Sequence, residues 1–155
     1  MIDPYDLTKP WDKVRLQEWF LFGVCVAGKS ARQTAAKVEA MLEDMRVQYD
    51  NIGFPLMFTH SAPFASIETA IKRGKLGYYL RKFKLGQYKR INKAFRGMVK
   101  IDPATVTLEE LEQIHGVGAK TAFAIPHAHS IVPQFSRTLE NACQNDWIAS
   151  SVGRI

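Results

Sequence analysis

The stretch LEELEQIHGVGAKTAFAI (residues 108–125) has two helix-like segments on either side of a Gly-Val-Gly turn. Thr107 precedes it, and Thr107 and Glu110 have the spacing of a capping box at a helix start. Apolar residues at 108, 111 and 114 predict a short helix that the first glycine ends. A tight turn between two packed helices needs backbone that accepts positive φ, which glycine supplies. The stretch therefore predicts a helix-hairpin-helix motif over residues 107–125.

The turn of this motif is a candidate phosphate-binding site. We expect the valine between the glycines to point inward and successive N–H groups at the start of the second helix to face outward. A helix N-terminus attracts anions, so these groups can hold a DNA phosphate. Such a contact carries no base specificity, because every nucleotide has the same phosphate. The candidate DNA-binding residues in the hairpin are His115, Gly116, Val117 and Gly118.

A second signal for nucleic acid is the distribution of charge. The chain has 155 residues and a net charge of +6. Residues 72–100 contain 11 Lys or Arg and no Asp or Glu, whereas the rest of the chain has 10 basic and 15 acidic residues. A basic block on an acidic body is typical of a surface that binds a polyanion. The alternative is a solvated charged face.

Within this block, residues 88–100 have the apolar spacing of an amphipathic helix. Tyr88, Ile91, Ala94, Phe95 and Met98 are expected to face the core. The basic residues Lys89, Arg90, Lys93 and Arg96 are expected to point outward. The first three of these are candidate DNA contacts.

The remaining pattern predicts an all-α fold with a single helical domain over residues 1–155. No stretch shows the alternation of apolar and polar residues that is typical of a strand, and no hairpin turn of the Asn-Gly type is present. A chain of this length supports one sizeable core. The other helices are expected at 12–28, 30–45, 64–73, 76–100 with a break near Gly86, and 137–151, with a loop over 49–63.

Composition narrows the class of protein. The chain is 46% hydrophobic and 23% charged, as in an ordinary globular protein, and no apolar run approaches the ~20 residues of a membrane span. The two cysteines form no Cys-x-x-Cys pair and the histidines form no metal set, so no metal and no cofactor are expected. The N-terminus does not have the pattern of a signal peptide. We expect an intracellular monomer, cytoplasmic and associated with the nucleoid or else nuclear, with no membrane partner.

The segment LEELEQIHGVGAKTA (108–122) resembles the helix-hairpin-helix DNA glycosylase superfamily, which includes endonuclease III and 8-oxoguanine glycosylase. Weaker similarity extends upstream to about residue 14. In bifunctional members a lysine at the position of Lys120 forms a Schiff base with the sugar. The resemblance therefore implies a glycosylase with AP-lyase activity that acts on double-stranded DNA containing a damaged or modified base. It also implies that a polar turn, here Lys29 and Ser30, reaches the extruded base or a phosphate.

The chemistry of Lys120 can be argued from the residue itself. A neutral amine can attack C1′ of the sugar as the base leaves, and it then forms a covalent imine. Burial and the positive end of a helix dipole both disfavour the charged amine, and Lys120 is expected at such an end. The alternative role for Lys120 is a phosphate contact.

The C-terminal part of the chain departs from the family pattern. Relatives have an aspartate about 18–20 residues after the lysine, whereas this chain has SRTLENAC (136–143) there. Glu140 is the candidate catalytic carboxylate in its place. The chain is also short after the hairpin, which indicates a truncated or divergent C-terminus. The alternative function is a helix-hairpin-helix DNA-binding protein without catalysis.

Overall fold

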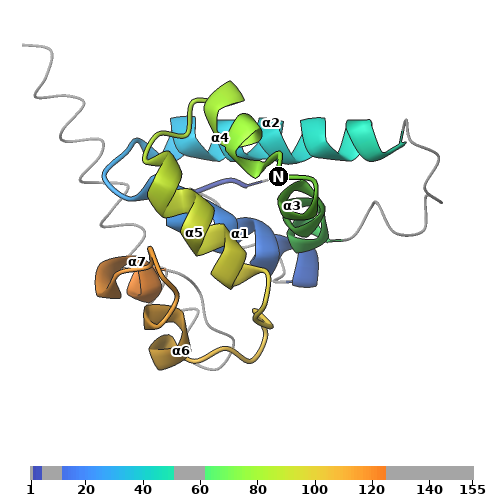
Figure 1. The fold of residues 1–155 in the computed structure, drawn as a ribbon. Helices are drawn as coiled ribbons and strands as arrows, with labels where there is room; N and C mark the ends of the chain where they lie inside the picture. Colours follow the sequence, from blue (N-terminus) through green and yellow to red (C-terminus); the bar gives the residue numbers. More distant parts are fainter. Residues whose placement is uncertain (1, 5–11, 51–61, 125–155) are drawn as a thin grey trace, which may run out of the picture.

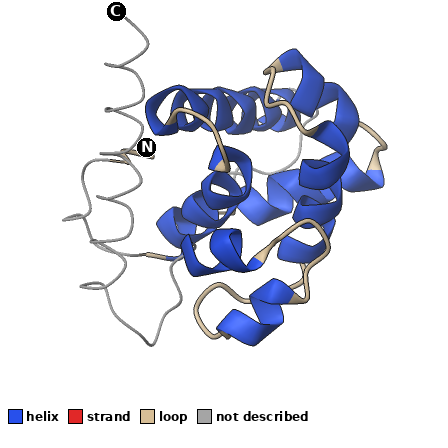
Figure 2. Cartoon of the chain, turned by 90° about the vertical axis from the view of Figure 1, so that its left-hand side faces the viewer, coloured by secondary structure: helices blue, strands red, loops and turns tan. Residues whose placement is uncertain are grey.

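The computed structural model describes residues 2–4, 12–50 and 62–124, and these residues form helices joined by loops, with no strand (Figure 2). The helices are α1 (Lys13–Val26), α2 (Ala31–Asp50), α3 (Pro63–Lys72), α4 (Leu76–Lys82), α5 (Tyr88–Met98), α6 (Leu108–Glu112) and α7 (Ala119–Ala124). The predicted all-α class is confirmed for this part of the chain. The helix expected at 137–151 lies outside the described residues.

Helix α1 is at the centre of the fold. It packs against α2, α3, α5 and α7. Its residues from Trp19 to Cys25 are all buried, so the helix is enclosed on every side, as a helix without a polar face must be. The Asp12 carboxylate accepts a hydrogen bond from the Arg15 N–H at 2.8 Å and caps its start. Gly28, with φ +70°, follows its end.

Helix α2 is longer than the sequence predicted, because it continues to Asp50 and not to residue 45. No glycine or proline occurs within Ala31–Asp50, so nothing in the chain stops the helix earlier. Pro63 is the first residue of α3, a position that suits its fixed φ and missing N–H. The predicted loop over 49–63 is therefore wrong at both ends, and 51–61 lie outside the described residues.

Helices α4 and α5 are separated at the predicted break. Gly86 has φ +67°, and Lys84 and Gln87 beside it also adopt positive φ, at 52° and 42°. The apolar face predicted for α5 is largely confirmed, since its members from Ile91 onward are fully buried and Tyr88 is partly buried. In Figure 1, α5 lies in front of α1, with α4 above it and the α6–α7 pair below it. Helix α5 therefore separates the hairpin from α4.

Candidate nucleic-acid interface

The first helix of the hairpin begins with the predicted capping box. The Thr107 hydroxyl accepts a hydrogen bond from the Glu110 N–H at 3.2 Å. The Glu110 carboxylate accepts one from the Thr107 N–H at 2.8 Å. These two bonds satisfy donors that have no partner inside the helix and fix its start. Helices α6 and α7 then pack against each other, and α7 also packs against α1.

The turn between these helices requires a glycine at position 116. Gly116 has φ +93°, a conformation that residues with a side chain rarely adopt. A Cβ at this position would lie 2.6 Å from the Arg90 carbonyl oxygen of α5. Val117 is 5% exposed and its N–H donates to the Ile114 carbonyl at 2.9 Å. The inward valine and the positive φ expected from the sequence are both present.

Gly118 has a different environment. Its φ is not positive, and a Cβ built on it would have no heavy atom within 4 Å. The residue is exposed, and its carbonyl accepts the Ala122 N–H at 2.8 Å, in the first turn of α7. The fold itself therefore does not require glycine at 118. What the glycine provides is open space over the backbone at the start of α7.

Lys120 is the second residue of α7, at the predicted helix start, and its side chain is exposed. Among the residues that the structure describes, it has no ion-pair partner. The burial expected from the sequence is not found for this side chain in the described part of the chain. Its exposure leaves it accessible to a ligand from solvent.

Two other exposed residues, Lys93 and His115, lie beside the turn. Lys93 Nζ lies 3.1 Å from His115 Nε2. An ammonium can only donate, so the imidazole nitrogen is the acceptor when this contact is a hydrogen bond. Lys89 is also exposed, one turn before Lys93 on α5. The sequence predictions for Lys89, Lys93 and His115 as accessible residues near the hairpin are compatible with this arrangement.

The outward orientation predicted for Arg90 is wrong. Its Nη1 donates to the Gly116 carbonyl at 3.0 Å and its Nη2 to the Val24 carbonyl at 2.8 Å. Nε donates to the Gln87 side chain at 2.5 Å. The guanidinium therefore connects α5 to the end of α1 and to the hairpin turn. A signal was present in the sequence, since Arg90 is four residues before the buried Ala94 and borders the apolar face.

Lys29 is likewise turned toward the protein. Its Nζ donates to the Cys25 carbonyl at 3.0 Å and to the Leu85 carbonyl, and burial lowers the pKa of its ammonium. It connects the α1–α2 turn to the α4–α5 turn. Ser30 is exposed, and its carbonyl accepts the Thr34 N–H at 3.0 Å at the start of α2. Of the two residues predicted in this turn, Ser30 alone is exposed.

A second lysine lies at the α4–α5 turn and was not predicted from the sequence. Lys37 Nζ of α2 donates to the Lys84 carbonyl at 3.2 Å. Its position in the middle of α2 gave no indication of this contact, because the partner is 47 residues away in the chain.

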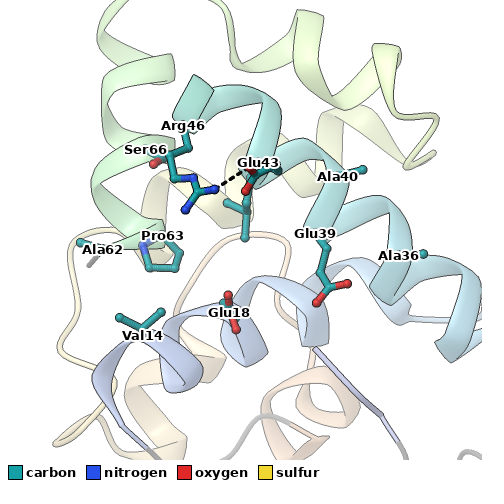
Figure 3. A pocket seen from close by; sticks show the side chains of 11 residues that line it. Val14, Glu18, Ala36, Glu39, Ala40, Glu43, Arg46, Ala62, Pro63 and Ser66 are labelled. Atoms are coloured by element: carbon teal, nitrogen blue, oxygen red, sulfur yellow. Dashed lines mark hydrogen bonds and ion pairs between the residues drawn. The ribbon is translucent and has the colours of Figure 1, made fainter. Parts of the chain in front are cut away.

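Acidic residues lie elsewhere on the surface. Helix α6 exposes Glu109, Glu110 and Glu112. A pocket between α1, α2 and α3 is lined by Glu18, Glu39 and the Glu43–Arg46 ion pair, whose N–O distance is 2.5 Å (Figure 3). Burial raises the pKa of the Glu18 carboxyl. Both surfaces are unfavourable for an anionic ligand.

Glu140, the predicted catalytic carboxylate, lies outside the described residues. Within the part of the chain that is described, no three or more His, Cys, Asp or Glu residues are grouped as metal ligands, and no helix is long and apolar enough to cross a membrane. Comparisons of the chain with protein-family models, curated proteins and solved structures found no match.

Proposed function

We propose that this protein is a DNA glycosylase with AP-lyase activity that holds duplex DNA at the α6–α7 hairpin and uses Lys120 as the Schiff-base amine. The single observation that supports this best is the hairpin turn itself. Gly116 makes the turn, Val117 anchors it, and Gly118 leaves the start of α7 open. A phosphate can approach closest where no side chain stands over the backbone.

Charge supports the same binding mode. Lys93 lies beside His115 just before the turn, Lys89 is exposed one helical turn earlier on α5, and Lys120 is exposed on α7. Each lysine that neutralises a phosphate releases a counterion, so duplex affinity falls steeply as salt rises. The exposed carboxylates of α6 then fix the side from which DNA can come, because they disfavour an approach over that helix.

In the proposed reaction the neutral Lys120 amine attacks C1′ of a flipped nucleotide and the base leaves from the same carbon. The C1′–O4′ bond then opens, with O4′ taking up a proton, and C1′ becomes the carbon of an imine with Lys120. The imine acidifies the C2′ proton, and loss of that proton breaks the C3′–O bond by β-elimination. The amine must lose its proton before it attacks. Glu140 is proposed as the carboxylate that assists base loss.

The experiment is borohydride trapping on a duplex that contains one abasic site, which needs no knowledge of the base excised. We expect a covalent protein–DNA adduct with the natural chain and none with Lys120→Gln. The matched control is Lys93→Gln, a neighbouring exposed lysine, which should keep the adduct at saturating protein. An adduct that survives Lys120→Gln would show that another amine reacts and would contradict the assignment.

A second candidate function is duplex binding without catalysis. The exposure of Lys120 favours it, because the described part of the chain does not desolvate the amine. In this case no adduct forms, but Gly118→Ala weakens duplex binding by placing a methyl group where the phosphate approaches. Lys93→Gln should also lower the slope of log affinity against log salt by about 0.9. A protein that shows neither an adduct nor duplex binding has neither function.

A further inference from the structure

The strongest unassigned feature outside the hairpin is Tyr78 on α4. Its side chain is 55% exposed, and it is the one large hydrophobic residue that is exposed in the described part of the chain. Single exposed apolar residues are common on protein surfaces, so exposure alone does not make a site. Tyr78 differs because many of its neighbours in the sequence are basic. Exposed basic residues on or next to α4 are Lys72, Arg73, Lys75, Arg81, Lys82 and Lys84.

The ring of Tyr78 is held in place by its neighbours. It meets the ring of the buried Tyr79 edge to face, with 5.4 Å between centroids and 71° between planes. Lys82 Nζ lies 5.9 Å from the Tyr78 centroid, and Asp44 of α2 accepts a hydrogen bond from Lys82 at 2.7 Å. That hydrogen bond raises the pKa of Lys82, which therefore stays charged beside the ring. The result is an oriented aromatic surface that solvent reaches.

The positive charge around this ring is only partly neutralised by described carboxylates. Lys72 pairs with Glu68 at 3.1 Å and Lys82 pairs with Asp44. Lys75, Arg81 and Lys84 are exposed and have no carboxylate partner among the described residues. Lys37 adds a further cation at the Lys84 carbonyl. Arg81 also lies 5.7 Å from the Tyr88 ring centroid and donates to the Gly77 carbonyl, and these contacts leave its positive charge uncompensated. An exposed aromatic ring on a helix with cations that lack a described carboxylate partner is complementary to a polyanion that also carries flat rings.

We propose that the α4 surface, made of Lys75, Tyr78, Arg81 and Lys84, is a second nucleic-acid site that binds an unpaired strand. One base stacks on Tyr78, and the cations hold the phosphates on either side of it. Stacking of this kind requires an unpaired base, because the faces of bases in a duplex are already covered. An acidic polypeptide would satisfy the cations but would leave the ring without a partner.

This site is distinct from the hairpin, since α5 lies between α4 and the α6–α7 pair (Figure 1). The proposal goes beyond the function proposed above and does not depend on it. A protein with both sites would hold duplex DNA at the hairpin and a separate unpaired stretch at α4.

The test is fluorescence anisotropy with a labelled oligothymidine of about 12 nucleotides, a length within the usual range for one single-strand site. Tyr78→Ala should weaken binding about tenfold or more, because stacking on one aromatic side chain contributes that much. Tyr78→Phe keeps the ring and should bind like the natural chain. Far-UV circular dichroism of both variants checks that α4 is intact.

Lys93→Gln is the control for the other site. It should weaken duplex binding and leave the dependence of oligothymidine binding on Tyr78 unchanged. If the natural chain neither binds duplex DNA nor gives a borohydride adduct, the function proposed for the hairpin is wrong. The result at α4 would not be affected.

Two outcomes would overturn the α4 proposal. One is an oligothymidine affinity that does not change in Tyr78→Ala, or that falls equally in Tyr78→Phe. The other is a poly-glutamate probe that binds as tightly as the oligonucleotide and is weakened equally by Tyr78→Ala, which would assign the surface to an acidic protein.

Discussion

At the scale of single residues, the two glycines of the hairpin turn have different physical roles. Gly116→Ala would force positive φ on a residue with a side chain and would place a Cβ 2.6 Å from the Arg90 carbonyl oxygen. We expect the free energy of unfolding to fall by about 2–4 kcal/mol. Gly118→Ala meets neither obstacle and should change it by about 0.5 kcal/mol or less. Urea denaturation followed by tryptophan fluorescence measures both, and equal effects would contradict the distinction.

Cys25 gives a prediction about pH. It is fully buried, and burial raises the pKa of its thiol to about 12. Because an unfolded thiol loses its proton near pH 9, the unfolded chain is favoured as pH rises from there toward about 12. The free energy of unfolding should therefore fall by up to about 1.4 kcal/mol per pH unit in this window, from this residue alone.

The measurement compares denaturation of the natural chain and of Cys25→Ala at about pH 8 and about pH 10, below and above the start of this window. Cys25→Ala is less stable at both values because it leaves a cavity. The difference between the two proteins should shrink as pH rises, since the variant lacks the thiol. A constant difference would show that Cys25 does not titrate on unfolding.

At the scale of elements, the contact between α5 and the hairpin depends on Gly97. A Cβ on Gly97 would collide with Ile114 Cγ2, on a β-branched side chain that has little freedom to move. Alanine normally stabilises a helix by about 0.5–1 kcal/mol relative to glycine. We expect Gly97→Ala to destabilise the protein instead, and we expect Ile114→Ala in the same chain to remove most of that effect. A double-mutant cycle of unfolding free energies measures the coupling.

Gly77 of α4 provides the control for this experiment. The nearest atom to a Cβ there is Arg81 Nη1 at 3.2 Å, at the end of a flexible side chain. Gly77→Ala should therefore stabilise the protein by the usual helix amount. If both glycines respond alike, the close approach of α5 and the hairpin is not what selects glycine at position 97.

At the scale of the whole molecule, Arg90 joins the first helix of the described core to the last hairpin. Arg90→Met keeps most of the apolar volume but removes the hydrogen bonds to the Gly116 and Val24 carbonyls. We expect a loss of about 2–3 kcal/mol in unfolding free energy, because hydrogen bonds from a charged donor contribute more than neutral ones. Chemical denaturation measures it. Lys89→Met, at the exposed neighbouring position, should cost about 0.5 kcal/mol or less.

Much of the local structure could be predicted because it depends on residues close together in the chain. The capping box of Thr107 and Glu110, the buried Val117 and the core face of α5 follow from side-chain spacing over a few residues. The end of α2 was missed because the stop expected at 45 had no glycine, proline or cap behind it. The predicted catalytic role of Lys120 depends on the DNA complex and stays a prediction.

The sequence by itself determined the helical class, the basic block and the hairpin, because composition, periodicity and glycine conformation act within one segment. Only the tertiary structure decided which basic residues face solvent. Arg90 and Lys29 turn inward because α1, the hairpin and the α4–α5 turn bring carbonyl oxygens within reach. Lys89, Lys93 and Tyr78 stay exposed. A long cationic side chain takes its direction from the acceptors that distant elements place around it, and the spacing along its own helix does not specify them.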